Sequence, residues 1–210
     1  MGTPPPLARG GHSVSGVILF GALPLLTFLG IFIPQVLGGA GLVGSLEARQ
    51  SPFEQLGAPP PEAAQVKTAG VRVPAHYLVT EQTDTGLVLR RPGGDRGLYV
   101  EAHRVQKPPV FAGAEAISFI GRLLGDHPDG RQCRDQSSLT LQGVAGVQFA
   151  VCYRVTRADG STYPSVDYYW FGTGSDGSVF YEVEAWTSLW QWFGFMGEAR
   201  GAVAGVTWTI

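Results

Sequence analysis

Hydrophobic and polar positions alternate along much of the C-terminal two thirds of the chain. The clearest case is 147–157, where every second residue is apolar and most of the residues between are polar. Because strand side chains point alternately to the two faces, this spacing predicts a strand with one buried face. The Asp-Gly pair within Ala158 to Ser161 is typical of a hairpin turn, so 162–172 is expected to pair back.

Two other segments have helical spacing. In 112–125, four aliphatic residues recur at intervals of three or four, and 188–200 opens with Ser188 as a candidate cap. Two further strands are predicted within 76–91, on either side of a turn. Single strands are predicted at 97–106, 138–142, 179–186 and 203–208. The order β-β-β-α-β-β-β-β-α-β, rich in antiparallel hairpins, predicts an α+β fold.

The segment 16–44 contains no charged residue over a length that exceeds the ~20 apolar residues of a membrane span. It therefore predicts a single transmembrane helix. A cleaved signal peptide and a buried core helix are the alternatives. Arg9 precedes the segment and Glu47 follows it, which favours a cytoplasmic N-terminus and a single-pass protein of the inner membrane.

The chain is thus expected to have four parts. Residues 1–15 form an N-terminal tail, and 16–44 form the anchor. The proline-rich 45–70 is expected to be a stiff linker that holds the domain off the bilayer. Residues 71–210 form the α+β domain, which the predicted orientation places in the periplasm.

Charge changes this picture little. The chain has 15% charged residues and a net charge of −2, and 71–210 hold more acidic than basic side chains. Nucleic-acid binding needs clustered positive charge, so this class of partner is excluded. The expected partners are the lipid bilayer, through the anchor, and an integral membrane protein complex.

Candidate chemistry is sparse. The histidines lack metal-ligand spacing, and the chain has no nucleophile elbow, phosphate loop or dinucleotide fingerprint, so no catalytic residue, metal or cofactor is predicted. An enzyme would need a polar pocket that holds His103 or His127 with two acids. Cys133 and Cys152, the only cysteines, fit an oxidising compartment, where they either pair or stay free thiols.

The segment 186–196 is unusually aromatic. With a helix from 188 onward, Trp190 and Phe193 are expected to pack on the sheet, and Trp192 and Phe195 to lie largely off that face. Such a helix is buried on both sides, meets a protein partner, or meets lipid headgroups. The predicted docking residues are Trp186, Trp190, Trp192 and Phe195, with Tyr168 and Trp170 of the strand 162–172.

The stretch VFYEVEAWTSLWQWFGFMGEARGAVAGVTW, together with the strand meander before it, resembles the PsbP-like family over roughly 71–210. The resemblance implies an α/β/α sandwich and a mostly non-catalytic role as an extracytoplasmic subunit or assembly factor of photosynthetic complexes. It implies no catalytic residue. The expected function is a membrane-anchored accessory subunit, most concretely of a bacterial reaction-centre or light-harvesting assembly in which photosystem subunits are the partners.

A second resemblance leads to an alternative. DYYWF followed by a turn and FYEVEAW is similar to the C-terminal part of exosortase-associated proteins, and HPDGRQC is loosely similar to their cysteine-containing stretch. It implies an envelope factor that supports the export or processing of surface polymers.

Overall fold

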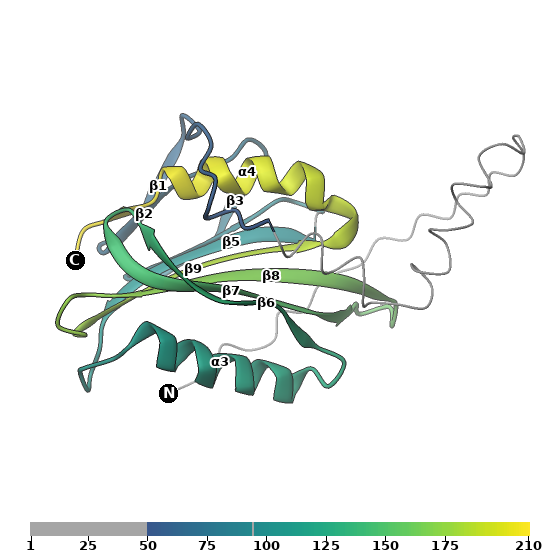
Figure 1. The fold of residues 1–210 in the computed structure, drawn as a ribbon. Helices are drawn as coiled ribbons and strands as arrows, with labels where there is room; N and C mark the ends of the chain where they lie inside the picture. Colours follow the sequence, from purple (N-terminus) through teal and green to yellow (C-terminus); the bar gives the residue numbers. More distant parts are fainter. Residues whose placement is uncertain (1–49, 94) are drawn as a thin grey trace, which may run out of the picture.

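A large antiparallel sheet lies between two layers in the computed structural model, which describes residues 50–93 and 95–210 (Figure 1). The strands are β1 (Ala63–Gln65), β2 (Ala69–Arg72), β3 (Leu78–Gln82), β4 (Gly86–Arg90), β5 (Arg96–Arg104), β6 (Arg131–Leu141), β7 (Val144–Thr156), β8 (Thr162–Thr173), β9 (Val179–Ser188) and β10 (Thr207–Trp208). The helices are α3 (Ala112–Asp126), a 3₁₀ turn η1 (Leu189–Gln191) and α4 (Trp192–Ala204). The predicted α+β class with antiparallel strands is confirmed.

The large sheet has the order β3-β4-β5-β9-β8-β7-β6, and every neighbouring pair is antiparallel. The predicted hairpin between β7 and β8 is present. Gly160 has φ +80°, a left-handed conformation that glycine adopts without strain, and Arg157 N–H donates to Ser161 O at 2.8 Å. In this register Phe149 lies opposite Tyr169, which puts aromatic side chains of both strands on one face.

Helix α3 covers that face. Its buried side chains are Ala112, Ala116 and Ile120, a spacing of four that forms one stripe of the helix. They pack against a cluster of mainly aromatic residues from β7, β8 and β9: Phe149, Val151, Tyr169, Phe171 and Phe180. The predicted helix 112–125 is confirmed.

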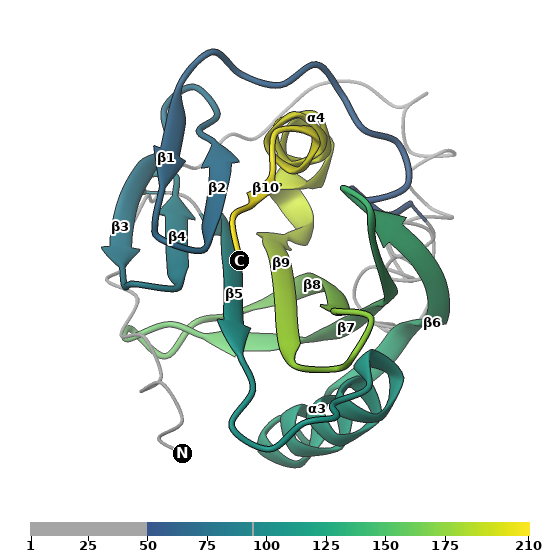
Figure 2. The same ribbon diagram turned by 90° about the vertical axis from the view of Figure 1, so that its left-hand side faces the viewer.

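The opposite face is covered by α4 and by a second, small sheet of order β1-β2-β10 (Figure 2). Phe195 and Met196 of α4 pack in one core with Leu98 and Val100 of β5 and Val71 of β2. This core is larger than the core under α3, and it ties the C-terminal helix to strands from the start of the domain.

The linker prediction needs correction. Residues 50–70 do not hold the domain away as a spacer, because Phe53 is buried in the core and β1 pairs with β2. Gly57 N–H donates to Arg200 O at 3.2 Å, so this segment lies along α4. Its prolines suggested a stiff spacer, but the segment packs on the domain.

The strand after α3 also differs from the prediction. β6 begins at Arg131, well before the predicted strand 138–142, and its pairing with β7 is interrupted by register shifts near Arg134. Cys133 and Cys152 form a disulfide between these strands, with their Cα atoms 5.7 Å apart. The last strand is shorter than expected, since α4 continues to Ala204.

The predicted tail 1–15, the anchor 16–44 and residues 45–49 lie outside the described residues. Within 50–93 and 95–210, neither helix is both long and apolar enough to span a bilayer.

Candidate functional site

The structure reverses the predicted faces of the aromatic segment. Trp192 and Phe195, expected at a partner surface, are buried, whereas Trp190, expected on the sheet, is 71% exposed. Tyr168, Trp170 and Trp186 are buried as well. The prediction that these five buried side chains form an accessible docking surface is therefore wrong, and of the six predicted docking residues Trp190 alone is exposed.

The error comes from the phase of the helix. Residues 189–191 form a 3₁₀ turn, and the α-helix begins only at Trp192. A 3₁₀ turn advances ~120° per residue against ~100° in an α-helix, so three residues shift the phase by roughly 60°. That shift changes the position of Trp190 relative to α4. Within α4 itself, Trp192 and Phe195 lie on the face of the buried Ala199 and Ala202, and Phe193 lies on the other side.

Three of the buried aromatics, Trp192, Tyr168 and Trp186, have specific partners. Trp192 Nε1–H donates to Tyr168 Oη at 2.8 Å. The Trp186 ring lies against Gly97, where an added Cβ would stand only 2.2 Å from a ring carbon, and the guanidinium of Arg90 lies 5.2 Å from the ring centroid. These side chains hold the fold together.

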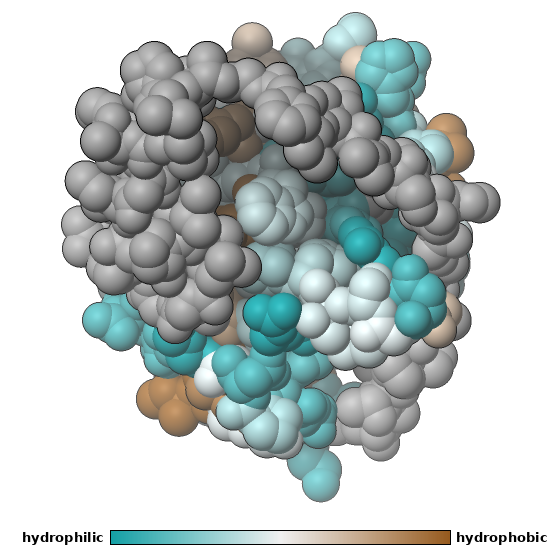
Figure 3. Space-filling view, turned by 90° about the vertical axis from the view of Figure 1, so that its right-hand side faces the viewer, coloured by the Kyte–Doolittle hydropathy of each residue, from teal (hydrophilic) through white to brown (hydrophobic). Residues whose placement is uncertain are grey.

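Two aromatic rings remain at the surface where α4 begins. Trp190 is 71% and Phe193 is 87% exposed, and we call this pair the aromatic tip. Figure 3 faces this end of the molecule, where the described residues are mostly hydrophilic or of intermediate hydropathy. The Phe193 ring touches the buried Trp192 edge-on, with ring centroids 4.9 Å apart, but most of its surface faces outward. Aromatic residues are enriched at protein interfaces.

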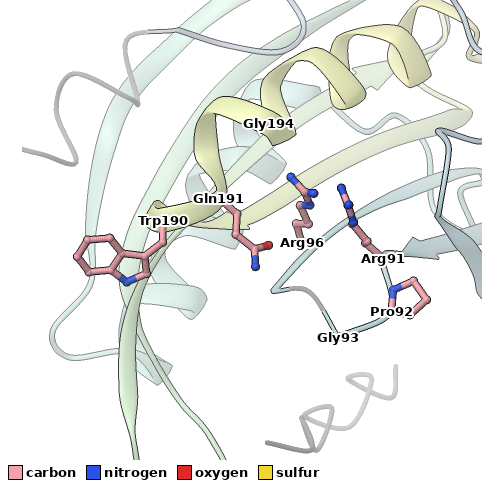
Figure 4. A pocket seen from close by; sticks show the side chains of 7 residues that line it. All are labelled: Arg91, Pro92, Gly93, Arg96, Trp190, Gln191 and Gly194. Carbon is pink, nitrogen blue, oxygen red and sulfur yellow. The ribbon is translucent and has the colours of Figure 1, made fainter. Parts of the chain in front are cut away.

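A pocket of about 340 Å³ lies next to the tip. It is lined by Arg91, Pro92, Gly93, Arg96, Trp190, Gln191 and Gly194, and we call it the arginine pocket. In Figure 4 the side chains of Arg91 and Arg96 lie side by side, Gln191 points toward them, and the Trp190 ring points away. The loop after β4, the start of β5 and the start of α4 thus meet here.

Glu198 of α4 fixes the two arginines. Its Oε1 accepts from Arg91 Nη1 at 2.8 Å, and its Oε2 lies 3.4 Å from Arg96 Nη1. Tyr77 Oη–H also donates to Oε2, at 2.9 Å. Burial, and then the negative charge of Glu198, raise the pKa of Tyr77, so its hydroxyl stays protonated. One carboxylate thus balances two guanidinium groups.

A second group of polar residues occupies the opposite face of the sheet, on β5 and β9. Glu101 lies opposite Glu182 in the register, and His103 Nδ1 lies 3.6 Å from Glu101 Oε2. Burial and the neighbouring Glu101 raise the pKa of Glu182 to about 7. Burial raises the pKa of Glu101 too, but contacts with His103, Tyr99 and Thr85 outweigh burial and hold it at about 2.

This group brings one histidine of the sequence prediction together with two acids. The contact with Glu101 raises the pKa of His103, and the two side chains form a pair beside Glu182. Glu184, which shares the strand face with Glu182, accepts from Tyr169 Oη–H at 3.4 Å. Among the residues that the structure describes, no group of three or more histidines, cysteines and acids is arranged to hold a metal ion.

Sequence reasoning missed the arginine pocket. Arg91 and Arg96 come from a β4–β5 turn, and Glu198 is about a hundred residues away in α4, so only the tertiary fold joins them. The pair of Glu101 and His103 had a visible signal, since residues two apart in a strand share a face.

No protein-family model matches the chain, and no curated protein matches it. Solved structures are similar at low identity. CyanoP, the PsbP of Synechocystis sp. PCC 6803, has a TM-score of 0.48 and 12% identity, over 70% of this chain and 91% of its own. LpqN of Mycobacterium tuberculosis, described as involved in cell envelope biogenesis, has a TM-score of 0.45 and 17% identity, over 71% of this chain and 85% of its own.

A structure from Bacteroides thetaiotaomicron has a TM-score of 0.40 and 11% identity; the match covers 69% of this chain and about half, 49%, of that one. These are partial likenesses of fold and indicate no shared function. The sheet order and the two helical layers carry the α+β assignment by themselves. The photosynthetic role stays a prediction.

Proposed function

We propose that this chain is a non-catalytic accessory subunit that docks on a larger membrane protein complex through the aromatic tip. The observation that carries the proposal is the exposure of Trp190 and Phe193, at 71% and 87%, at the start of α4, whose other face is buried in the core. Large aromatic side chains dominate binding energy at protein interfaces, and Trp190 and Phe193 are only three residues apart in the chain.

The uncharged segment 16–44 supports the same proposal from the sequence. As a single span with a cytoplasmic N-terminus, it would keep the domain on the periplasmic face of the inner membrane. A tethered domain needs only a modest docking surface, since the tether raises the effective concentration of the partner.

The most concrete version of the proposal is a bacterial reaction-centre or light-harvesting assembly, which rests on the resemblance of 71–210 to PsbP-like sequences. The alternative version is an exosortase-associated envelope factor, which rests on the weaker resemblance of the β8–β9 region. The two versions differ in the partner and share the docking surface.

The test is isolation of the full chain from its native membranes in mild detergent, with and without Trp190→Ser and Phe193→Ser together. The matched control is Phe111→Ser with Ile117→Ser, since these side chains are similarly exposed, at 65% and 67%, around the start of α3. We expect a large complex for the wild type and the control, and free protein for the tip variant.

An absorption spectrum of the same fraction separates the two versions. Near-infrared absorption that comigrates with the protein supports the photosynthetic version. A colourless complex that contains a multi-span exosortase supports the envelope version. A wild-type chain that elutes alone contradicts the accessory role, and a complex that survives in the tip variant contradicts the docking surface.

A further inference from the structure

The arginine pocket contains more positive charge than its internal partner neutralises. Arg91 and Arg96 both bind Glu198, and the pocket's other lining residues carry no acidic group. After pairing, about one positive charge is left, which gives the pocket a preference for an anion.

The buried part of the pocket has hydrogen-bonding capacity that the fold leaves unused. The Arg96 side chain is only 10% exposed, yet its Nε–H has no hydrogen-bond acceptor among the residues that the structure describes. Its contact with Glu198 is at 3.4 Å, long for a charge-assisted hydrogen bond. A buried donor without a partner costs stability, so an acceptor that enters the pocket would be bound favourably.

The start of α4 adds space and a partial positive charge. This helix has no side-chain cap at its N-terminus and no acidic residue in its first turn. Gly194 of that turn lines the pocket, and a Cβ at this position would stand 3.1 Å from Arg96 Nη1. Because glycine has no side chain, the approach to the Arg96 guanidinium stays open. The positive end of the helix dipole lies beside this guanidinium.

We propose that the arginine pocket binds a phosphate group. The guanidinium groups of Arg91 and Arg96, the amide of Gln191 and the first turn of α4 approach from different elements (Figure 4), which fits a tetrahedral oxyanion. A pocket of about 340 Å³ is large enough for a phosphate together with part of the molecule that bears it. The site does not depend on the proposed docking function.

The first experiment is titration of the purified full chain, in a neutral detergent and phosphate-free buffer, with inorganic phosphate by calorimetry. We expect a dissociation constant of about 1 mM or tighter. Arg91→Gln is expected to weaken binding at least about tenfold, because it removes one charged donor. The matched control, Arg122→Gln on α3, is expected to bind like the wild type.

Glu198→Gln provides a test with the opposite sign. It keeps the shape of the side chain but removes the internal anion that competes for both arginines, so phosphate should bind several-fold more tightly. Tighter binding in this variant and weaker binding in Arg91→Gln would together support the pocket. Equal binding by the wild type, Arg91→Gln and Glu198→Gln would overturn it.

A second titration identifies the source of the phosphate. Micelles of the same detergent are doped with phosphatidylglycerol or, as a control, left undoped. Binding to the doped micelles that inorganic phosphate displaces and Arg91→Gln loses would identify a lipid headgroup. Binding of inorganic phosphate alone would identify a soluble phosphate compound. Absence of both, at phosphate concentrations up to about 10 mM, would overturn the proposal, whatever the result of the docking test.

Discussion

Phe193 and Phe195 lie two positions apart in helix α4 and have opposite surroundings. Phe195 is fully buried in the core under the helix, whereas Phe193 is 87% exposed. Trp192 and Trp190 show the same contrast one turn earlier. The difference teaches that aromatic content alone does not locate an interface, because the phase of the helix decides which rings are buried in the core and which are exposed.

The largest expected effect separates the two phenylalanines. Phe195→Ala should lower the free energy of unfolding by about 4 kcal/mol, since it removes a fully buried ring and leaves a cavity. Phe193→Ala should change it by less than about 0.5 kcal/mol. Chemical denaturation of the full chain in mild detergent, followed by near-ultraviolet circular dichroism, measures both values. Similar losses in the two variants would contradict the assigned helix phase.

A smaller effect is expected for the hydrogen bond that joins the helix to the sheet. Tyr168→Phe removes the acceptor of Trp192 Nε1–H and leaves a buried donor unpaired, at a cost of about 2 kcal/mol. Tyr181→Phe removes a hydroxyl from the same side of the sheet without affecting Trp192, and serves as the control. The same denaturation measurement gives the free energy of unfolding of both variants. Equal losses in Tyr168→Phe and Tyr181→Phe would show that the hydrogen bond to Trp192 does not stabilise the fold.

The other face of the sheet predicts a pH dependence. The pKa of Glu182 is raised to about 7 in the folded chain, so the folded state holds a proton that the unfolded state releases near pH 4.5. Stability is therefore expected to fall as the pH rises from about 4.5 to 7, by about 1 kcal/mol after allowance for solvent around this side chain. The raised pKa of His103 acts in the same direction at the upper end of this range.

Glu182→Gln should flatten this slope, because it keeps the shape and removes the titration. Unfolding free energies of the wild type and the variant at several pH values between 5 and 8 test this prediction. Glu101 does not interfere in that range, because its depressed pKa causes stability to be lost only as the pH falls from about 4.5 toward 2. A slope that persists unchanged in Glu182→Gln would contradict the assignment.

The smallest expected effect on stability belongs to the tip. Trp190→Ser with Phe193→Ser should leave the free energy of unfolding within about 0.5 kcal/mol of the wild type, since neither ring packs in the core. This result is what allows the loss of a partner to be interpreted as loss of docking. A loss of several kcal/mol would show that the tip has a structural role.

Sequence patterns predicted the parts of the fold that depend on local periodicity. The alternation in β7, the turn at Gly160 and the helical spacing in α3 all led to correct elements. The two strands before residue 73 could not be found in this way, because β1 and β2 are only three and four residues long and owe their conformation to pairing.

The prediction of which face of α4 is buried was wrong because it was based on too few residues. The bulky rings at 189–196 suggested one face, but the small residues further along set another: Ala199, Ala202 and Val203 are buried and are in phase with Phe195. Small apolar residues allow close approach to the sheet, and they were the better guide to the packed side. The arginine pocket, in contrast, depends on contacts between distant segments that periodicity does not reveal.

The central claim is that Phe193 touches a partner in the native membrane. The most direct measurement is photo-cross-linking in the native cells, with a photoreactive amino acid in place of Phe193 and, as a control, in place of the similarly exposed Ile117. The account predicts one defined cross-linked product, with a subunit of a membrane complex, at position 193 and none at 117. No product at 193, or the same product at both positions, would contradict it.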